Sequence, residues 1–189
     1  MSSDSSHRAK LTAHGVFIQV LNLGVMLTGK SGIGKSELAL GLINKGYKLI
    51  ADDAINFTKR DNKIIGTAEA VLQDFLEVRG LGILNIRKMF GDTAIAQSYQ
   101  LDLIVHIKQF ENSELSQIDR LNGIYTDVEL LGNKVPEVTI PVSPGRHLAV
   151  LVEAAVRNQM LKLSGYDAGQ AFQNQQANFL QQLREPHER

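Results

Sequence analysis

A glycine-rich octapeptide contains the residues whose types and spacing most directly suggest chemistry. Residues 29–36 read GKSGIGKS, which matches the pattern GxxxxGK[ST]. In this phosphate-binding loop (P-loop) the glycines allow positive φ and a close backbone approach to a polyphosphate, so that the loop N–H groups form an anion nest. The pattern predicts that Lys35 neutralises the β- and γ-phosphates and that the Ser36 hydroxyl ligates Mg²⁺. The alternative is a glycine turn that binds nothing.

The segments on either side of the loop agree with a phosphate site. Val16–Thr28 is apolar and strand-like with a turn at Asn22–Gly24, and residues 37–43 have the apolar spacing of a helix. A helix that begins at the loop directs its positive N-terminal end at the same site. The order of strand, loop and helix therefore predicts a site for a nucleoside triphosphate or another polyphosphate. The loop residues are Gly29, Lys30, Ser31, Gly32, Ile33, Gly34, Lys35 and Ser36.

Two acidic residues end the next strand-like segment. Tyr47–Asp53 reads as a buried strand with Asp52 and Asp53 at its end. In P-loop folds, a strand beside the loop commonly ends with an acid near the Mg²⁺. Adjacent strand residues point to opposite faces, so only one of these carboxylates can face the phosphates unless the strand is irregular there. We expect one to act as metal ligand or general base, and position alone does not choose between them. A pair of turn-forming aspartates is the alternative.

Further residues could contribute charged groups or a proton acceptor. His14 begins the first strand region and is either structural or catalytic. Glu77 and Arg79 share one face of an extended segment with two glycines directly after them. They suit Mg²⁺ ligation and phosphate contact, or they form a surface ion pair. Arg120, in the polar stretch 111–131, is either a phosphate contact or a solvated arginine.

The composition limits the class of protein. The chain has 189 residues, of which 43% are hydrophobic and 21% charged, as in ordinary globular domains. Its formal net charge is zero, which gives no sign of bulk nucleic-acid or anionic-membrane binding. It has no cysteine, so disulfides and thiolate metal sites are excluded. No apolar run approaches the ~20 residues of a membrane helix, and the first residues are polar. We therefore expect a cytoplasmic protein with neither nucleic acid nor membrane as a partner.

The remaining pattern predicts the elements that position these residues. We expect residues 1–12 to be a disordered tail and residues 13–189 to form a single domain. The helix after the P-loop is expected to end near Gly46. We further expect a hairpin over Asn56–Ile65, a short helix over Ala68–Phe75, a buried strand over Leu101–Ile107, an insertion or mobile loop over Glu111–Leu131, an edge strand or irregular extended segment over Val135–Val142, and helices over 148–163 and after Asp167.

Several of these segments, taken in this order, resemble the catalytic domain of HPr kinase/phosphorylase. The resemblance runs from about His14 to Gly169, and the stretch EVRGLGI at 77–83 is its most specific part. The matching segments are His14-Gly15, the P-loop, Leu49–Asp53, Leu76–Ile83, Pro141–Arg146 and Gly165–Ala168.

The resemblance implies a bifunctional enzyme. Its fold would be α/β, a P-loop core related to phosphoenolpyruvate carboxykinase, with a mixed sheet and C-terminal helices. The enzyme would phosphorylate a serine of HPr, the phosphocarrier of the sugar phosphotransferase system, with Mg²⁺ and with ATP or pyrophosphate as donor. It would also remove that phosphate by attack of inorganic phosphate, releasing pyrophosphate, and so regulate carbon metabolism. Members of the family form homo-oligomers, namely hexamers.

The resemblance also implies roles for individual residues. Asp53 matches the acid that takes the seryl proton in the kinase direction and returns it in the reverse direction. Lys35 matches the P-loop lysine, and His14 and Arg120 match other active-site residues. The Mg²⁺ ligands of the family match Ser36 and Glu77. The family residues that matter in both directions match Leu76, Glu77, Val78, Arg79, Gly80, Leu81, Gly82, Ile83, Leu84 and Asn85. Those that matter chiefly in dephosphorylation match Pro141, Val142, Ser143, Pro144, Gly145 and Arg146.

Three other functions are compatible with a P-loop. A small-molecule kinase usually has helices and a lid after the loop, whereas strands dominate here from Tyr47 to Val142. A non-catalytic nucleotide-binding module could lose the base and the metal ligands, yet Asp53, Ser36 and Glu77 are present. A kinase of the same family that acts on another protein or on a small-molecule acceptor stays open, because no motif marks a partner-binding surface.

Overall fold

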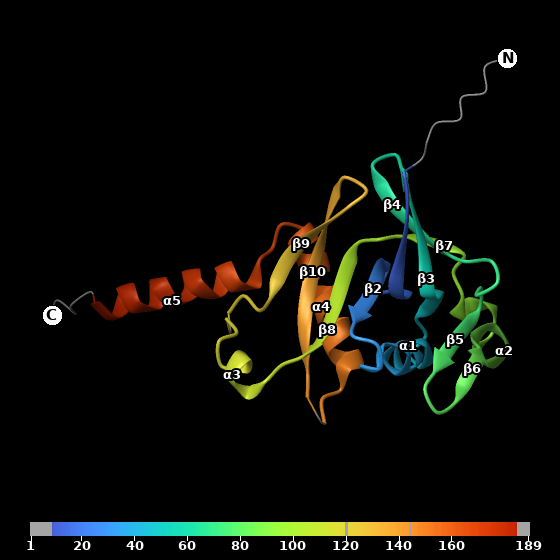
Figure 1. Cartoon of the computed structure of the whole chain (residues 1–189). Helices are drawn as coiled ribbons and strands as arrows, with labels where there is room; N and C mark the ends of the chain where they lie inside the picture. The colour runs from blue at the N-terminus through green and yellow to red at the C-terminus, as the bar shows by residue number, and fades with distance from the viewer. Residues whose placement is uncertain (1–8, 120, 144, 185–189) are drawn as a thin grey trace, which may run out of the picture.

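A mixed β-sheet forms the centre of the computed structural model, which describes residues 9–119, 121–143 and 145–184 (Figure 1). In these residues the main sheet has eight strands and a separate small sheet has two. The predicted mixed sheet with C-terminal helices is confirmed. The elements are β1 (Lys10–Val20), β2 (Leu23–Gly29), α1 (Lys35–Asn44), β3 (Lys48–Arg60), β4 (Lys63–Ala68), β5 (Phe75–Val78), β6 (Gly82–Asn85), α2 (Ile86–Phe90), a 3₁₀ turn (Asp92–Ala94), β7 (Ser98–Gln100), β8 (Leu103–Gln109), α3 (Asn112–Leu115), β9 (Tyr125–Leu130), β10 (Asn133–Val142), α4 (Leu148–Leu163) and α5 (Ala168–Arg184).

The first strands of the chain occupy the middle of the main sheet, whose order is β7-β4-β3-β1-β2-β8-β10-β9. β1 pairs antiparallel with both β2 and β3, and β2 pairs in parallel with β8. Because β1 begins at Lys10, which lies opposite Thr58 of β3, the predicted disordered tail is wrong for residues 10–12. Residues 1–8 lie outside the described part of the chain.

Each face of the main sheet carries its own apolar core. On one face α1 and α4 pack against the sheet, with Leu42 and Val156 fully buried (Figure 1). On the other face the rings of Phe17 and Phe57 pack edge to face, with centroids 5.6 Å apart. The β9–β10 and β3–β4 turns lie next to each other, since the Asn133 side chain donates a 2.6 Å hydrogen bond to the Asn62 carbonyl.

The short helix predicted over Ala68–Phe75 is wrong. The segment between β4 and β5 forms successive turns, in which the N–H of Leu72 donates to the Glu69 carbonyl at 3.0 Å and the N–H of Phe75 to the Leu72 carbonyl at 3.1 Å. These bonds span three residues rather than four, and Asp74 has a φ of 71°. A positive φ at a residue other than glycine interrupts a right-handed helix. The chain therefore turns directly into β5.

The stretch Glu111–Leu131, predicted as an insertion or mobile loop, contains α3 and β9. β9 is an edge strand of the main sheet and pairs antiparallel with β10. Its exposed polar residues, Thr126, Asp127 and Glu129, gave no sign of a buried face. Charged side chains of this kind are common on edge strands, where they oppose pairing with other chains.

β10 has neighbours on both sides, although its prolines predicted an edge or irregular segment. β9 pairs only with Asn133–Val138, and β8 pairs only with Glu137–Val142. Pro136 therefore lies where β8 is absent, and Pro141 lies where β9 is absent. Each half of β10 is an edge, which is how the strand accommodates residues that lack an N–H.

The two C-terminal helices that apolar spacing predicted are confirmed. α4 ends just before Gly165, which has a φ of 89°. α5 extends away from the sheet (Figure 1). Its side chains Phe172, Phe179 and Leu183 are exposed. No helix in the described ranges combines the length and the apolarity needed to cross a bilayer.

A hydrogen bond between Tyr47 and Glu153 joins the segment between α1 and β3 to α4. The Tyr47 hydroxyl donates to Glu153 Oε1 at 2.6 Å, and Lys45 pairs with the other carboxylate oxygen. Burial of the hydroxyl is the larger cause, and the hydrogen bond to the Glu153 carboxylate the next, of a rise in the pKa of Tyr47 to about 12. The pKa of a tyrosine in the unfolded chain is about 10. The contribution of the Tyr47 hydroxyl to folding stability is therefore fully present below pH ~10 and is lost as the pH rises through ~12.

We expect Tyr47→Phe to lower the free energy of unfolding by about 1 kcal/mol near neutral pH. The difference from the original chain should shrink toward pH ~12, where the hydroxyl loses its proton. Urea denaturation at several pH values measures both effects. Tyr166→Phe, which changes an exposed tyrosine, is the control. A Tyr47→Phe difference that is the same at every pH would contradict this role for the hydroxyl.

Candidate active site

The P-loop joins β2 to α1, as its flanking segments predicted. Gly32 and Gly34 have φ values of 77° and 101°, which favour glycine. At Gly29, where φ is 141°, space is a further constraint, because a Cβ there would lie 2.4 Å from the Ile107 carbonyl oxygen of the neighbouring strand β8. The loop therefore has the curvature and close packing that its glycines predicted.

Lys35 is the first residue of α1 and is buried in the loop. Its Nζ donates hydrogen bonds to the carbonyls of Gly29 at 3.0 Å and Lys30 at 3.3 Å. These bonds hold the ammonium group inside the curve of the loop. Because the N-terminal end of α1 carries a partial positive charge at the same place, the loop concentrates positive potential where an anion would bind.

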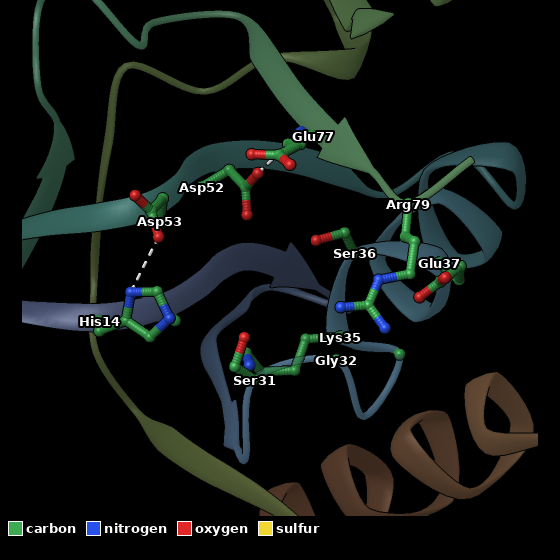
Figure 2. A pocket seen from close by; sticks show the side chains of 12 residues that line it. His14, Ser31, Gly32, Lys35, Ser36, Glu37, Asp52, Asp53, Glu77 and Arg79 are labelled. Atoms are coloured by element: carbon green, nitrogen blue, oxygen red, sulfur yellow. Dashed lines mark hydrogen bonds and ion pairs between the residues drawn. The ribbon is translucent and has the colours of Figure 1, made fainter. Parts of the chain in front are cut away.

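His14 and Asp53 face the P-loop from β1 and β3 (Figure 2). His14 Nδ1 lies 2.8 Å from Asp53 Oδ1, and both side chains are exposed. The strand is irregular at Asp53, which has a φ of 66°. The exception to strand alternation therefore applies, and the side chains of both Asp52 and Asp53 line the same pocket.

Asp52 connects the main sheet to the small sheet formed by β5 and β6. Its Oδ2 accepts a 2.9 Å hydrogen bond from the N–H of Glu77 on β5. Asp52 is only 8% exposed. Burial raises the pKa of this carboxyl and the carboxylates of Asp53 and Glu77 raise it further, while backbone hydrogen bonds oppose the shift. Burial therefore makes the negative charge of Asp52 costly to keep.

The strand β5 directs two charged side chains into the pocket. Leu76 and Val78 are buried in the core, so the alternating residue Glu77 and, just past the strand, Arg79 face the P-loop (Figure 2). The Arg79 guanidinium lies over Gly32, because a Cβ on that glycine would be 3.2 Å from Arg79 Nη1. The predicted common face of Glu77 and Arg79 is thus confirmed, with the guanidinium against the anion nest.

The structure brings His14, Asp53, Glu77, Arg79 and five residues of the P-loop into one pocket. Sequence reasoning gave no role to Glu37 and Gly15, and nothing separates Glu37 from an ordinary acid in the first turn of a helix. Sequence reasoning also left open whether Asp52 faces the phosphates. The hydrogen bond that Asp52 accepts from the Glu77 N–H could not be predicted from sequence. The lining residues are His14, Gly15, Ser31, Gly32, Gly34, Lys35, Ser36, Glu37, Asp52, Asp53, Glu77 and Arg79.

Other predicted residues do not line this pocket. Pro141 and Arg146 line a separate cavity that includes Tyr125 of β9. Within the segment Leu76–Asn85, Asn85 caps α2 by accepting a 2.9 Å hydrogen bond from the Lys88 N–H. Arg120 and Pro144 lie outside the described residues.

The donor groups in the pocket suit a magnesium ion. In the described part of the chain, no group of three or more His, Asp or Glu side chains is arranged to hold a metal by itself. Mg²⁺ usually keeps several waters and binds through one or two carboxylates and substrate phosphates, so it does not require such a group. The Ser36 hydroxyl and the carboxylates of Asp52 and Glu77 face the same space as the P-loop. This oxygen-only set fits the ion.

We expect Gly32→Ala to weaken nucleotide binding by on the order of tenfold, because L-residues at positive φ cost about 1–2 kcal/mol. Gly41→Ala, on the α1 helix that follows the loop, is the control. An added Cβ meets nothing within 4 Å at Gly41, so nucleotide affinity should stay unchanged while stability rises by up to ~1 kcal/mol. Calorimetric titration with ATP and thermal denaturation test this pair. Equal ATP affinities of the Gly32→Ala and Gly41→Ala variants would contradict a role for the loop N–H groups in phosphate binding.

The fold and the site define an α/β domain in which a P-loop, a lysine and several acids share one pocket. The family model described as HPr Serine kinase C-terminal domain matches residues 6–176. The chain belongs to this family, as the resemblance predicted.

Individual relatives agree with the family. The chain is 47% identical over 182 residues to an HPr kinase/phosphorylase of Neisseria meningitidis, covering 95% of this chain and 57% of that protein. It is 47% identical over 174 residues to an HPr kinase/phosphorylase of Xylella fastidiosa, covering 91% of this chain and 55% of the relative. The chain thus spans little more than half the length of these curated relatives.

A solved structure has the same architecture. The Hpr(Ser) kinase/phosphatase from Coxiella burnetii superposes with a TM-score of 0.78 at 35% sequence identity. The match covers 86% of this chain and 98% of the Coxiella chain.

Proposed function

We propose that this chain is a bifunctional protein-serine kinase/phosphorylase domain that acts on the phosphocarrier HPr. In one direction it transfers a phosphoryl group from ATP or pyrophosphate to a serine of HPr. In the other it removes that group by phosphorolysis with inorganic phosphate, and so regulates the sugar phosphotransferase system. The observation that carries the proposal is the His14–Asp53 pair, which faces Lys35 and the P-loop across one pocket. The names of the relatives support the choice of HPr.

In the kinase direction the P-loop binds the donor phosphates through its N–H groups and Lys35. A bound Mg²⁺ would neutralise part of the phosphate charge, with Ser36 and Glu77 as its proposed ligands. Asp53 accepts the proton of the seryl hydroxyl as the seryl oxygen attacks the phosphorus. A positioned base of this kind typically accelerates the reaction by about 10²–10⁴-fold. His14 orients Asp53 through their contact. Positive groups at the transferring phosphoryl provide the larger electrostatic contribution.

In the phosphorylase direction the same groups work in reverse. An oxygen of inorganic phosphate attacks the phosphorus of phosphoserine, the bond to the seryl oxygen breaks, and pyrophosphate forms. Asp53 returns the proton to the departing seryl oxygen. The exposed Arg79 guanidinium next to Gly32 offers a second positive group for the attacking phosphate. We assign Arg120 to the active site and Pro141–Arg146 chiefly to this direction on the basis of the family resemblance.

We propose further that residues 13–189 act as one catalytic domain in the cytoplasm. We also propose that the chain forms a homo-oligomer, namely the hexamer that the family resemblance implies. The exposed apolar side chains of α5, Phe172, Phe179 and Leu183, offer a surface for another copy of the chain. The resemblance provides no nucleic-acid or membrane partner.

The proposal is tested by phosphate transfer to purified HPr from ATP and, separately, from pyrophosphate, each with Mg²⁺. Addition of inorganic phosphate to the phosphorylated HPr should then regenerate HPr and release pyrophosphate. Phosphoserine on HPr that phosphate reverses would establish both directions. ATP binding without transfer to HPr would overturn this acceptor and would favour a kinase of the same family with another protein or small-molecule acceptor.

A further inference from the structure

An apolar hollow lies directly beside the active-site acids. Its walls are Val71 and Leu72 from the turns before β5, Phe75 at the start of β5, and Ile83 on β6. Val71 is 77% exposed and Ile83 is 73% exposed. Large apolar side chains that are exposed together usually mark a surface that contacts a partner.

This hollow and the P-loop pocket have a common wall. Asp52, Asp53 and Glu77 line both. On the P-loop side of these acids are the Lys35 ammonium and the Arg79 guanidinium, whereas the described lining of the other side is otherwise apolar. A phosphate donor is therefore favoured on one side of the acids and disfavoured on the other, because the hollow has no cation to offset its charge.

The geometry of transfer determines what can occupy the apolar side. The attacking and leaving oxygens of a phosphoryl transfer lie roughly in line on opposite sides of the phosphorus. A base must also lie within hydrogen-bond reach of the hydroxyl that it deprotonates. With the donor against the P-loop and Asp53 as the base, the acceptor serine approaches from the side of the hollow.

We propose that this hollow, formed by Val71, Leu72, Phe75 and Ile83, binds an apolar side chain of the acceptor protein that is adjacent in sequence to the phosphorylated serine. The inference rests on the proposed kinase function and extends it to acceptor recognition. The apolar contact brings the seryl hydroxyl to Asp53 without using any group that binds the donor. It also favours serines with an apolar neighbour over serines in polar segments.

The test is the steady-state kinetics of Val71→Ser with HPr as acceptor and saturating Mg²⁺-ATP. Val71 is not among the residues that we assign to donor binding or chemistry. We expect the KM for HPr to rise on the order of tenfold, because two methyl groups lose their apolar contact, with kcat changing less than twofold. The dissociation constant for ATP should be unchanged. Val71→Leu should retain a KM close to that of the original chain.

Val150→Ser is the matched control, since Val150 is 54% exposed on α4 and lies outside the hollow. HPr variants that replace each neighbour of the acceptor serine by serine, one at a time, complete a double-mutant cycle. The effect of Val71→Ser should disappear with the one HPr variant that lacks the bound side chain. Equal KM values for Val71→Ser and Val150→Ser would overturn the inference.

Failure of the proposed function and failure of the hollow as an acceptor site give different results. If the unmodified chain does not phosphorylate HPr, the proposed function fails before the hollow is tested. If Val71→Ser changes the oligomeric state by sedimentation and leaves the KM for HPr unchanged, the hollow contacts another copy of the chain and the inference is overturned.

Discussion

Asp53→Asn is expected to reduce phosphoryl transfer from ATP to HPr by about 10²–10⁴-fold, the usual contribution of a positioned general base. The amide is nearly the same size as the carboxylate and keeps an oxygen that can contact His14, which lies 2.8 Å from Asp53 in the original chain. It cannot accept the seryl proton. The loss should therefore appear in kcat, while the dissociation constant for ATP changes little. Initial rates of HPr phosphorylation and calorimetric titration with ATP measure the two quantities.

Asp52→Asn is the matched comparison, because this residue adjoins Asp53 and lines the same pocket. An asparagine oxygen can still accept the hydrogen bond from the Glu77 N–H, which is 2.9 Å long in the original chain. Burial already raises the pKa of Asp52, so the substitution removes a charge that is costly to keep. We expect a smaller loss of transfer than for Asp53→Asn. If Asp52→Asn abolishes transfer and Asp53→Asn retains it, the roles of the two acids must be exchanged.

Lys35→Met should lower the rate of phosphoryl transfer by about 10²–10³-fold, since it removes a preorganised positive group at the transferring phosphate. Methionine preserves much of the length and the apolar stem of lysine. Because Lys35 Nζ also bonds to the Gly29 and Lys30 carbonyls, weaker ATP binding should accompany the loss of rate. Single-turnover rates and ATP titration separate these effects.

Lys30→Met provides the comparison for Lys35, because Lys30 belongs to the same loop but its side chain is exposed. A solvated charge interacts weakly with its neighbours, so we expect less than a tenfold loss. Circular dichroism should show that both variants are folded. Similar losses for the two lysines would contradict a specific role for the buried ammonium group.

The P-loop and its flanking elements could be predicted from sequence because their signals are local. Glycines at fixed spacing, an apolar strand before them and an amphipathic helix after them are contained within residues 16–46. The glycine that ends α1 is likewise a local signal, and Gly46 has a φ of 94°. Interactions within such a segment depend little on the rest of the chain.

The arrangement of the acids could not be predicted, because it depends on tertiary structure. Strand alternation allowed one of Asp52 and Asp53 to face the phosphates, but the positive φ of Asp53 turns both toward the pocket. The family resemblance, not the spacing, selected Asp53. The small sheet that carries Glu77 is likewise held by long-range contacts, among them the Asp52 hydrogen bond.

The prolines of β10 show how a correct local rule gives an incomplete result. Pro136 and Pro141 do lie where one side of the strand is free. The rule could not show that two different neighbours leave opposite halves of the strand unpaired. β9 was missed for a related reason, since its partner β10 and not its own pattern makes it a strand.

The position of β1 in the middle of the main sheet also affects how the site can assemble during folding. Every residue that lines the active-site pocket lies between His14 and Arg79, on strands and loops that follow one another along the chain. The entropy cost of closing a loop rises with the logarithm of its length, and proteins with local contacts fold faster. The contacts of the site therefore close shorter loops than the pairing of β2 with β8, in which Thr28 and His106 are 78 residues apart. The pairing of β2 with β8 adds the second half of the sheet to a site whose residues all come from one earlier stretch of the chain.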